Sequence, residues 1–324
     1  EKVNLDRVGV IWGSGIGGLQ TFQEACFNFK KGDGTPRFNP FFIPKMIADI
    51  AAGHISIKYG LRGPNYVCVS ACASATNAII DAFNLIRLGK ADAIVTGGSE
   101  AGVNEMGMGG FNAMKAMSER NDDPKTASRP YDKDRDGFIM GEASGVLVLE
   151  DLEHAIRRGA KIYCEVVGGG ARADAYHLTA PHPEGLGARN VMNAALRDAG
   201  MQANEIDYIN THGTSTPLGD IAEAKAITDV FGEHAYNLNI SATKSMTGHC
   251  LGAAGVIEAI ACIQTVIHDI IPPTINHFTD DPDLDPRLNF TFNKAEKRVV
   301  NAALSNTFGF GGHNACVIVK KYKA

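Results

Sequence analysis

Cys72 is the residue in this chain whose type and setting could do the most chemistry. It stands between a short apolar run, residues 66–69, and an alanine- and isoleucine-rich segment that begins at Ser74. The cysteine is either a small hydrophobe in a tight strand-to-helix turn or a nucleophile whose thiolate is stabilised by a helix N-terminus. This stretch alone favours the structural role, because most free cysteines are structural.

Three later segments place polar side chains after a short apolar strand. Residues 208–217 carry His212, residues 241–249 carry Lys244 and His249, and residues 304–314 carry Phe308 in a glycine-rich loop. Functional groups gather at the carboxyl ends of strands in open α/β sheets. A hydrogen-bonded structural histidine or a solvated lysine would explain each residue separately. Their shared position after a strand favours a common site with Cys72.

This set of side chains favours acyl transfer by a nucleophilic thiol. The cysteine would attack a thioester carbonyl while backbone N–H groups hold the developing oxyanion. A cysteine protease needs one histidine and an Asn or Asp that orients it. Here two histidines occur without an acidic neighbour in sequence, which suits hydrogen bonding to a thioester oxygen and the stabilisation of an enolate.

Alternating strands and helices must position these groups, and they predict an α/β layered fold. Strands are expected at 7–12, 65–69, 93–96, 145–149, 162–167, 207–210, 238–242, 302–306 and 315–320, and helices at 74–88, 152–158, 188–199, 221–231 and 251–268. Asp220 and Glu223 have the spacing of a capping box at the start of one helix. A seam near residues 157–160 divides the chain into parts 1–158 and 159–324.

Two motifs resemble ligand sites but lack parts of them. The glycine-rich turn 13–18 fits GxGxxG, yet no second strand ending in Asp or Glu follows, so we reject dinucleotide binding and expect close backbone packing. Residues 132–143 begin like a calcium loop, but the twelfth position is Ala143 rather than Glu. A salt-bridged turn is the better interpretation of that segment.

The composition limits the class of protein and its partners. Hydrophobic residues make up 44% and charged residues 21%, which is ordinary for a globular protein, and the net charge of −5 argues against nucleic acid. Seven scattered cysteines without a CxxC pair indicate a reduced intracellular protein without a zinc site or disulfides. No apolar stretch reaches the roughly 18 residues of a membrane helix. No signal peptide is visible, and the chain opens almost directly into a strand.

Four motifs in order, together with RPYDKDRDGF at 129–138, resemble the β-ketoacyl-acyl-carrier-protein synthases, closest to type II. They are SACAS at 70–74, NTHGTSTP at 210–217, TKSMTGH at 243–249 and NTFGFGG at 306–312. The resemblance covers essentially all 324 residues. It implies a thiolase-like fold of two related α/β halves in a layered α-β-α-β-α arrangement, the first carrying the cysteine and the second the His, Lys and Phe-Gly loops.

The resemblance also implies the reaction and the roles of five residues. Decarboxylative Claisen condensation in fatty acid elongation would join an acyl group on Cys72 to malonyl-acyl carrier protein, giving 3-oxoacyl-acyl carrier protein and CO₂. His212 and His249 would stabilise the enolate, and Lys244 would support them, paired with Glu258. Phe308 would supply an oxyanion-hole N–H and act as a gate.

Other positions are assigned by the resemblance alone. The expected substrate-binding residues are Ile16, Phe42 and Phe111 in the acyl tunnel, Asp174 and Thr179 in a loop at the entrance, Thr214 and Thr216 at the pantetheine arm, and Phe310. Arg37 and Lys115 would face the acyl carrier protein. The resemblance further implies a cytoplasmic homodimer that uses no metal or cofactor, acyl and malonyl groups arriving on the carrier's phosphopantetheine.

Three features depart from the family pattern. His313 stands where threonine is common, and Ala73 follows the cysteine where Thr or Ser is frequent. The family's opening strand and helices are not found, so we expect the sequence to be an incomplete record of the working protein. The alternatives that remain are a catalytically silent, chain-length-factor-like subunit, against which Cys72 argues, and a thioester hydrolase of the same fold.

Overall fold

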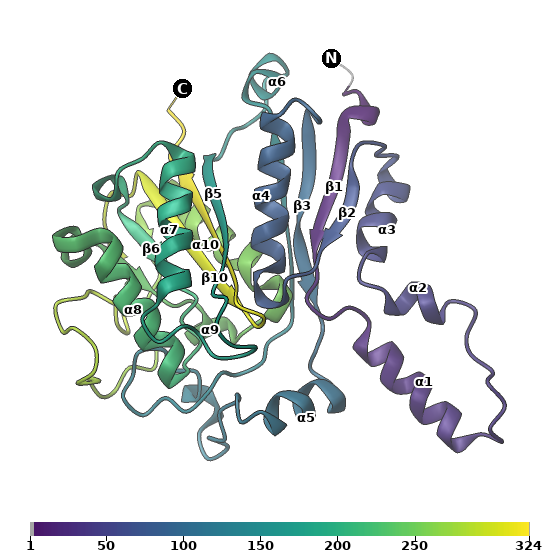
Figure 1. Cartoon of the computed structure of the whole chain (residues 1–324). Coiled ribbons are helices and arrows are strands. Elements are labelled where there is room, and N and C mark those ends of the chain that lie inside the picture. The colour runs from purple at the N-terminus through teal and green to yellow at the C-terminus, as the bar shows by residue number, and fades with distance from the viewer. Residues whose placement is uncertain (1–2, 324) are drawn as a thin grey trace.

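The computed structural model describes residues 3–323, and its first sheet is built from the N-terminal half of the chain (Figure 1). The strands are β1 (Val8–Gly13), β2 (Asn65–Cys68), β3 (Ala93–Glu100) and β4 (Ala143–Glu150), in the order β2-β1-β3-β4. β1 runs parallel to both β2 and β3, whereas β4 is antiparallel to β3. The Cys72 turn follows directly after β2.

The second sheet comes from the C-terminal half and contains the strands that precede the other polar loops. Its strands are β5 (Glu165–Ala173), β6 (Tyr208–Asn210), β7 (Asn239–Ser241), β10 (Ala302–Gly309) and β11 (His313–Lys320), in the order β5-β11-β10-β6-β7. β6 is parallel to β7 and β10, and β11 is antiparallel to β10 and β5. The carboxyl ends of β6 and β7 therefore lie at one edge, as the sequence predicts.

Two helices lie between the sheets and others cover the outer faces, which gives five layers (Figure 1). α4 (Ser74–Arg87) and α10 (Ala254–His268) form the inner layer and contact strands of both sheets. α3 (Ile50–Tyr59) covers β1 and β2, while α7 (Leu186–Ala199) covers β5 and β11 and packs on α8 (Pro217–Phe231). The order β2-β1-β3-β4 of the first sheet corresponds to the order β7-β6-β10-β11 of the second, which has β5 as one additional strand. The two halves are therefore built alike.

The inner helix corrects one expectation from the sequence. Residues Leu251–His268 are long and apolar enough to cross a membrane by length and composition, although no such stretch was expected. Within this structure 67% of that window is buried in the protein. The buried side chains, among them Val256, Ala259 and Val266, contact other core residues. The helix is thus a core element of the fold.

Several shorter elements connect the layers. They are α1 (Leu19–Lys31), α2 (Phe42–Met46), α5 (Glu105–Ala113), α6 (Leu152–Arg157), α9 (Lys244–Thr247), β8 (Ile270–Ile271) and β9 (Glu296–Lys297). α1 and α2 extend away from the two sheets as an arm (Figure 1). Of these, only α6 was expected from the sequence. α5 contains three glycines in nine residues, a composition that hides a helix from sequence patterns.

The strand expected at 162–167 instead runs from Glu165 to Ala173, through three consecutive glycines. A Cβ atom at Gly168 would lie 2.7 Å from the backbone nitrogen of Ala199, and one at Gly170 would lie 2.5 Å from the carbonyl oxygen of Val191. These glycines let α7 approach the sheet closely, so the run is a packing surface rather than a turn. The seam predicted at residue 158 falls between β4 and β5, and we retain the two-part division there as a proposal.

The two sheets differ at one edge. In the second sheet β5 pairs with the outer edge of β11, but within residues 3–323 no strand pairs with the outer edge of β4. The side chains of Val146 and Val148 on β4 are correspondingly 55% and 63% exposed. A cavity of about 810 Å³ lies beside this edge, lined by residues of α4, β4, β5 and α10.

Candidate active site

Cys72 lies in a tight turn, η2 (Ala71–Ala73), between β2 and α4. Ala71 has φ +51°, a conformation that non-glycine residues rarely adopt and that often marks a functional turn. The hydroxyl of Ser74 holds the turn closed, because it accepts from the N–H of Ser70 and donates to the carbonyl of Ala71. The turn aims the cysteine side chain between the two sheets, where it is 9% exposed.

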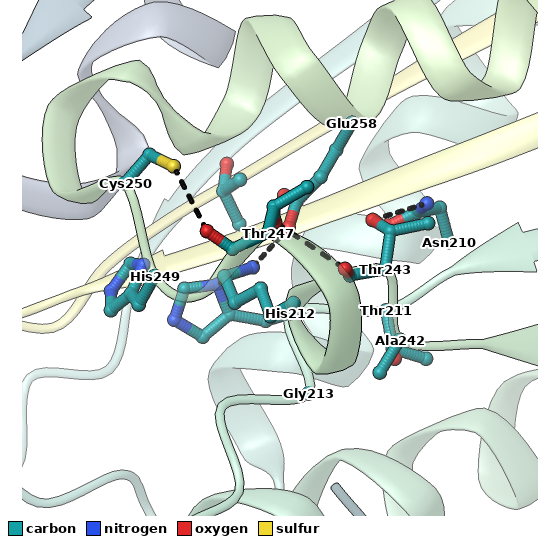
Figure 2. A network of polar contacts seen from close by, with 12 residues as sticks. Asn210, Thr211, His212, Gly213, Ala242, Thr243, Thr247, His249, Cys250 and Glu258 are labelled. Carbon is teal, nitrogen blue, oxygen red and sulfur yellow. Dashed lines mark hydrogen bonds and ion pairs between the residues drawn. The ribbon is translucent and has the colours of Figure 1, made fainter. Parts of the chain in front are cut away.

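The two predicted histidines meet Cys72 from the second half of the chain. The Nε2 atom of His249 lies 3.1 Å from Cys72 Sγ. The His212 ring stands edge-on to the His249 ring, with centroids 5.2 Å apart. Both imidazoles are nearly buried and lie side by side in Figure 2. The prediction that segments 177 residues apart in the chain would share one site is therefore met by the geometry.

Lys244 stands behind the histidines and pairs with Glu258. Its ammonium group donates to Glu258 Oε1 and lies 3.4 Å from Nδ1 of His212. Both members of the ion pair are 2% exposed at the side chain. Lys244 begins α9, and its partner Glu258 is on the following long helix, α10, as the resemblance implies; Figure 2 shows Glu258 on that helix. A buried charge needs such a partner, because an unpaired ion in the interior is costly.

Burial and Lys244 together keep both imidazoles neutral at physiological pH. Burial lowers the pKa of His212 well below its ordinary value, and the positive charge of Lys244 and the neighbouring His249 act in the same direction. The pKa of His249 is lowered in the same way by burial and by Lys244. A neutral imidazole offers one N–H donor and one acceptor nitrogen. Two such rings can serve as hydrogen-bond donors and as proton acceptors.

The pKa of the Cys72 thiol is shifted in the direction opposite to the one predicted from the sequence. Burial raises its pKa from 9.0 to about 11, opposed by the charge of Lys244 and by backbone N–H groups. The helix N-terminus was expected to lower this pKa, but Cys72 precedes α4 by two residues and lies in the interior. Desolvation of the thiolate is the larger effect. The resting group is a thiol whose proton must leave during attack.

The backbone N–H next to the sulfur belongs to Phe310, where the sequence pointed to Phe308. The N–H of Phe310, with that of Cys72 itself, lowers the pKa of the thiol by stabilising negative charge. Phe308 is the penultimate residue of β10, and its ring centroid lies 5.6 Å from that of His212. We therefore transfer the proposed oxyanion-hole donor from Phe308 to Phe310, two residues further along the chain.

A cavity of about 350 Å³ opens onto the cysteine and histidines. Of the residues singled out in the sequence, its lining includes Cys72, Phe111, Lys115, Asp174, Thr179, His212, Thr214, Thr216, His249, Phe308 and Phe310. Lys244 and Glu258 lie behind this lining. Ile16 is 41% exposed on its turn, Phe42 begins α2 on the arm, and the Arg37 side chain is 80% exposed. The structure does not bring these three to the cavity.

Asn314, not anticipated from the sequence, joins the loop after Phe310 to the predicted entrance loop. Its amide donates 2.9 Å to Asp174 Oδ1, and the N–H of Asp174 donates to the carbonyl of Gly312. The N–H of Gly311 donates to the carbonyl of Leu178. These bonds tie the two loops together along one side of the cavity.

Glu223 is a buried site residue whose role the sequence suggested wrongly. α8 begins at Pro217 with Thr216 as its N-cap, so Asp220 and Glu223 do not form a capping box. The carboxylate of Glu223 instead accepts from the backbone N–H groups of His212 and Gly213, both at 2.9 Å. Burial raises its pKa to about 7, opposed by these N–H groups. The spacing of Asp220 and Glu223 is visible in the sequence, but the hydrogen-bond partners of Glu223 lie in the loop before the helix.

No group of three or more His, Cys, Asp or Glu side chains is placed to hold a metal ion in the part of the chain that the structure describes. In the acidic loop that resembles a calcium site, the carboxylate of Asp132 accepts backbone N–H groups of Phe278, Thr279 and Asp134. Its oxygens thus stabilise a turn. The use of no metal or cofactor remains a prediction.

Comparison with known proteins relates both halves of the chain to one family. Residues 1–155 match the model of the β-ketoacyl synthase N-terminal domain, and residues 163–278 match that of the C-terminal domain. The chain is 49% identical over 323 residues to 3-oxoacyl-[acyl-carrier-protein] synthase 2 of Synechocystis sp., covering 100% of this chain and 77% of that protein. It is 50% identical to the Staphylococcus aureus protein of the same name, over 98% of this chain and 76% of the other.

The fold is also found among solved structures. One similar chain comes from the structure of a type II polyketide synthase acyl-carrier protein in complex with its ketosynthase bound to the hexaketide. It is 32% identical to this chain with a TM-score of 0.93, and the match covers 99% of this chain and 79% of that one. Together with the family models, this confirms the thiolase-like arrangement of two α/β halves predicted from the sequence.

Proposed function

Because the chain belongs to the β-ketoacyl synthase family, we propose that it catalyses decarboxylative Claisen condensation in fatty acid elongation. An acyl group held on Cys72 joins the two-carbon unit of malonyl-acyl carrier protein, which yields 3-oxoacyl-acyl carrier protein and CO₂. The observation that carries this proposal is the approach of His249 Nε2 to within 3.1 Å of Cys72 Sγ, beside a second neutral histidine in one cavity.

The first half-reaction loads the enzyme. The Cys72 sulfur attacks the acyl thioester carbonyl as its proton passes to Nε2 of His249, and the proton is then returned to the departing carrier thiolate. The N–H groups of Cys72 and Phe310, which already stabilise negative charge at the sulfur, stabilise the tetrahedral oxyanion. The products are an acyl-enzyme and free carrier thiol, so atoms and charge balance.

The second half-reaction forms the carbon–carbon bond. The neutral imidazoles of His212 and His249 donate hydrogen bonds to the malonyl thioester oxygen, and loss of CO₂ leaves an enolate on that oxygen. The enolate carbon attacks the acyl carbonyl, and Cys72 leaves as the new ketone forms. Burial and the positive charge of Lys244 together keep the histidines neutral, since both lower the pKa of each ring.

The cavity supports a place for each part of the substrate. Thr214 and Thr216, whose hydroxyls are 2.9 Å apart at the lining, are proposed to bind the pantetheine arm. Phe111 is proposed to contact the acyl chain, because its ring lies 6.2 Å from that of Phe310 at the inner wall. The roles proposed for Ile16 and Phe42 in the acyl tunnel are supported by the family resemblance alone.

We propose acyl carrier protein as the partner that delivers both groups. A similar ketosynthase, 32% identical, has been solved with its acyl carrier protein, and Lys115 lies at the cavity lining here, where it could meet an acidic carrier. Arg37 on the exposed arm is the second proposed contact. A homodimer and a cytoplasmic location are also proposed, on the basis of the family.

One assay tests this function. The chain is supplied with acyl and malonyl carrier proteins, and the products are analysed by mass spectrometry together with CO₂ release. Condensation predicts a carrier-bound product two carbons longer, absent with Cys72→Ser. Free fatty acid without elongation would identify a thioester hydrolase, and no turnover with either donor would identify a silent subunit; each result contradicts the proposal.

A further inference from the structure

We propose that Glu100 is a positioning residue of the condensation reaction, whose carboxylate holds three separate segments in register around Cys72. The proposal rests on the proposed function and deepens it. Glu100 is the last residue of β3 and is 5% exposed. Its role is not visible in the sequence, because every group that hydrogen-bonds to its carboxylate lies at least 83 residues away along the chain.

The first segment is the glycine-rich turn after β1. Glu100 Oε2 accepts from the N–H of Gly15 at 2.6 Å, and Oε1 accepts from the N–H groups of Ile16 and Gly17 at 3.2 and 3.4 Å. The Ser14 hydroxyl also donates to Oε1, at 3.4 Å. Successive N–H groups in such a turn form an anion-binding concavity. Here the anion is a carboxylate of the same chain.

The second segment is η6 (Leu251–Ala253), which begins two residues after His249. The N–H of Gly252 donates to Glu100 Oε2 at 3.2 Å, so one oxygen ties the glycine-rich turn to η6. η6 leads directly into α10, which carries Glu258. The carboxylate therefore fixes the segment that connects His249 with the partner of Lys244.

The third segment is the Cys72 turn, which Glu100 holds through the glycine-rich turn: it packs against Gly15 rather than bonding to the carboxylate itself. A Cβ atom at Gly15 would lie 2.7 Å from Glu100 Oε2 and 3.1 Å from the carbonyl oxygen of Ala71. A Cβ atom at Gly252 would lie 2.2 Å from the nitrogen of Gly15 and 2.5 Å from Glu100 Oε2. The three backbones meet with no space for a side chain at either glycine.

The charge of Glu100 also reaches the nucleophile. Among the described residues, no Lys, Arg or His side chain forms an ion pair with this carboxylate; backbone N–H groups stabilise it instead. Burial raises the pKa of Glu100, and the N–H groups of Gly15, Ile16, Gly17 and Gly252 oppose that rise. The negative charge in turn raises the pKa of Cys72. Glu100 thus disfavours a resting thiolate while it holds the turn in place.

The test uses Glu100→Gln, which keeps the side chain's shape and removes its charge. One end of the amide then points a donor at backbone N–H groups. We expect kcat for condensation to fall about 10- to 100-fold, since small misplacements of reacting groups have effects of that size, while KM for malonyl carrier protein stays within about twofold. We also expect the pH profile of Cys72 alkylation by iodoacetamide to move to lower pH. A purely structural residue would not shift that profile.

Two further variants separate the parts of the proposal. Glu142→Gln is the matched control, because Glu142 is exposed and accepts one backbone N–H, from Val103 at 2.9 Å; kcat and the pH profile should stay as in the wild type. Glu100→Asp keeps the charge on a side chain one methylene shorter, so the alkylation profile should match the wild type while kcat stays low. Equal effects of the Glu100 and Glu142 variants would overturn the proposal.

If Glu100→Gln does not fold, Gly15→Ala perturbs the same contact from the other side. Its new methyl group meets Glu100 Oε2 and the Ala71 carbonyl, so kcat should fall with the alkylation profile unchanged. A wild-type kcat in either Glu100→Gln or Gly15→Ala would show that the clamp does not serve the reaction. Should the wild-type chain itself fail to condense, the proposed function fails, while the alkylation shift in Glu100→Gln still tests the effect of Glu100 on Cys72.

Discussion

The alkylation of Cys72 should rise steadily with pH and show no plateau near neutrality. Burial raises the pKa of this thiol from its ordinary 9.0 to about 11. At pH 8 the thiolate is then about 0.1% of the total, against about 10% for an ordinary thiol, which is a difference of about 100-fold, or about 2.7 kcal/mol. Because the thiolate is the reactive form, the rate should increase about tenfold per pH unit between pH 7 and 10.

The assay treats the protein with iodoacetamide at each pH and measures alkylation of the Cys72 peptide by mass spectrometry. Cys26, which is half-buried on the α1 arm, provides a reference thiol in the same sample. Circular dichroism at each pH confirms that the fold persists. A Cys72 rate at pH 7 equal to that at pH 10 would refute this reasoning, because it would show a thiolate already stabilised at neutrality despite burial.

Two other predictions concern the groups behind the cysteine. His212→Ala should still form the acyl-enzyme but lose malonyl decarboxylation, whereas His249→Ala should lose both, because only His249 approaches the sulfur, at 3.1 Å. Mass spectrometry of the acyl-enzyme and measurement of CO₂ release distinguish the two variants. The reverse pattern would exchange the roles of the two histidines. Glu258→Gln should lower the free energy of unfolding by about 3–5 kcal/mol, since it leaves the buried Lys244 without its counter-ion. Urea unfolding measures this loss, the double variant Lys244→Met with Glu258→Met should recover most of it, and a loss below about 1 kcal/mol would contradict the argument.

The fold could be predicted from the sequence where an element carries a clear apolar pattern. The strands β1 and β10 were found within a few residues because they are short runs buried on both faces, and the helices α4 and α7 because each buries one regular face. α5 was missed, since its glycines and methionines carry no such period. The start of α8 was misplaced because Asp220 and Glu223 imitate a cap, while the helix begins at Pro217, four residues before the expected start at residue 221.

For the candidate site, some residues could be selected from the sequence and others could not. Residue types that do chemistry and stand after strands, such as Cys72 and His249, could be selected from the sequence, because topology brings strand ends together. Glu100 and Glu223 could not, since their partners are backbone N–H groups outside their own elements and the residue type of a carboxylate does not reveal them. The pKa of Cys72 was predicted in the wrong direction because desolvation depends on the packed interior.

The open side of β4 has a consequence for handling the protein in solution. A strand that presents a row of free N–H and C=O groups beside β-branched side chains can add a strand from another molecule and continue the sheet. Within residues 3–323, Val146 and Val148 carry no charge, no proline interrupts β4, and the charged residue of the strand, Glu150, stands at its end and is paired with Arg158. Self-association through this surface would increase with protein concentration and depend little on ionic strength, because backbone hydrogen bonds and apolar contacts would hold it together.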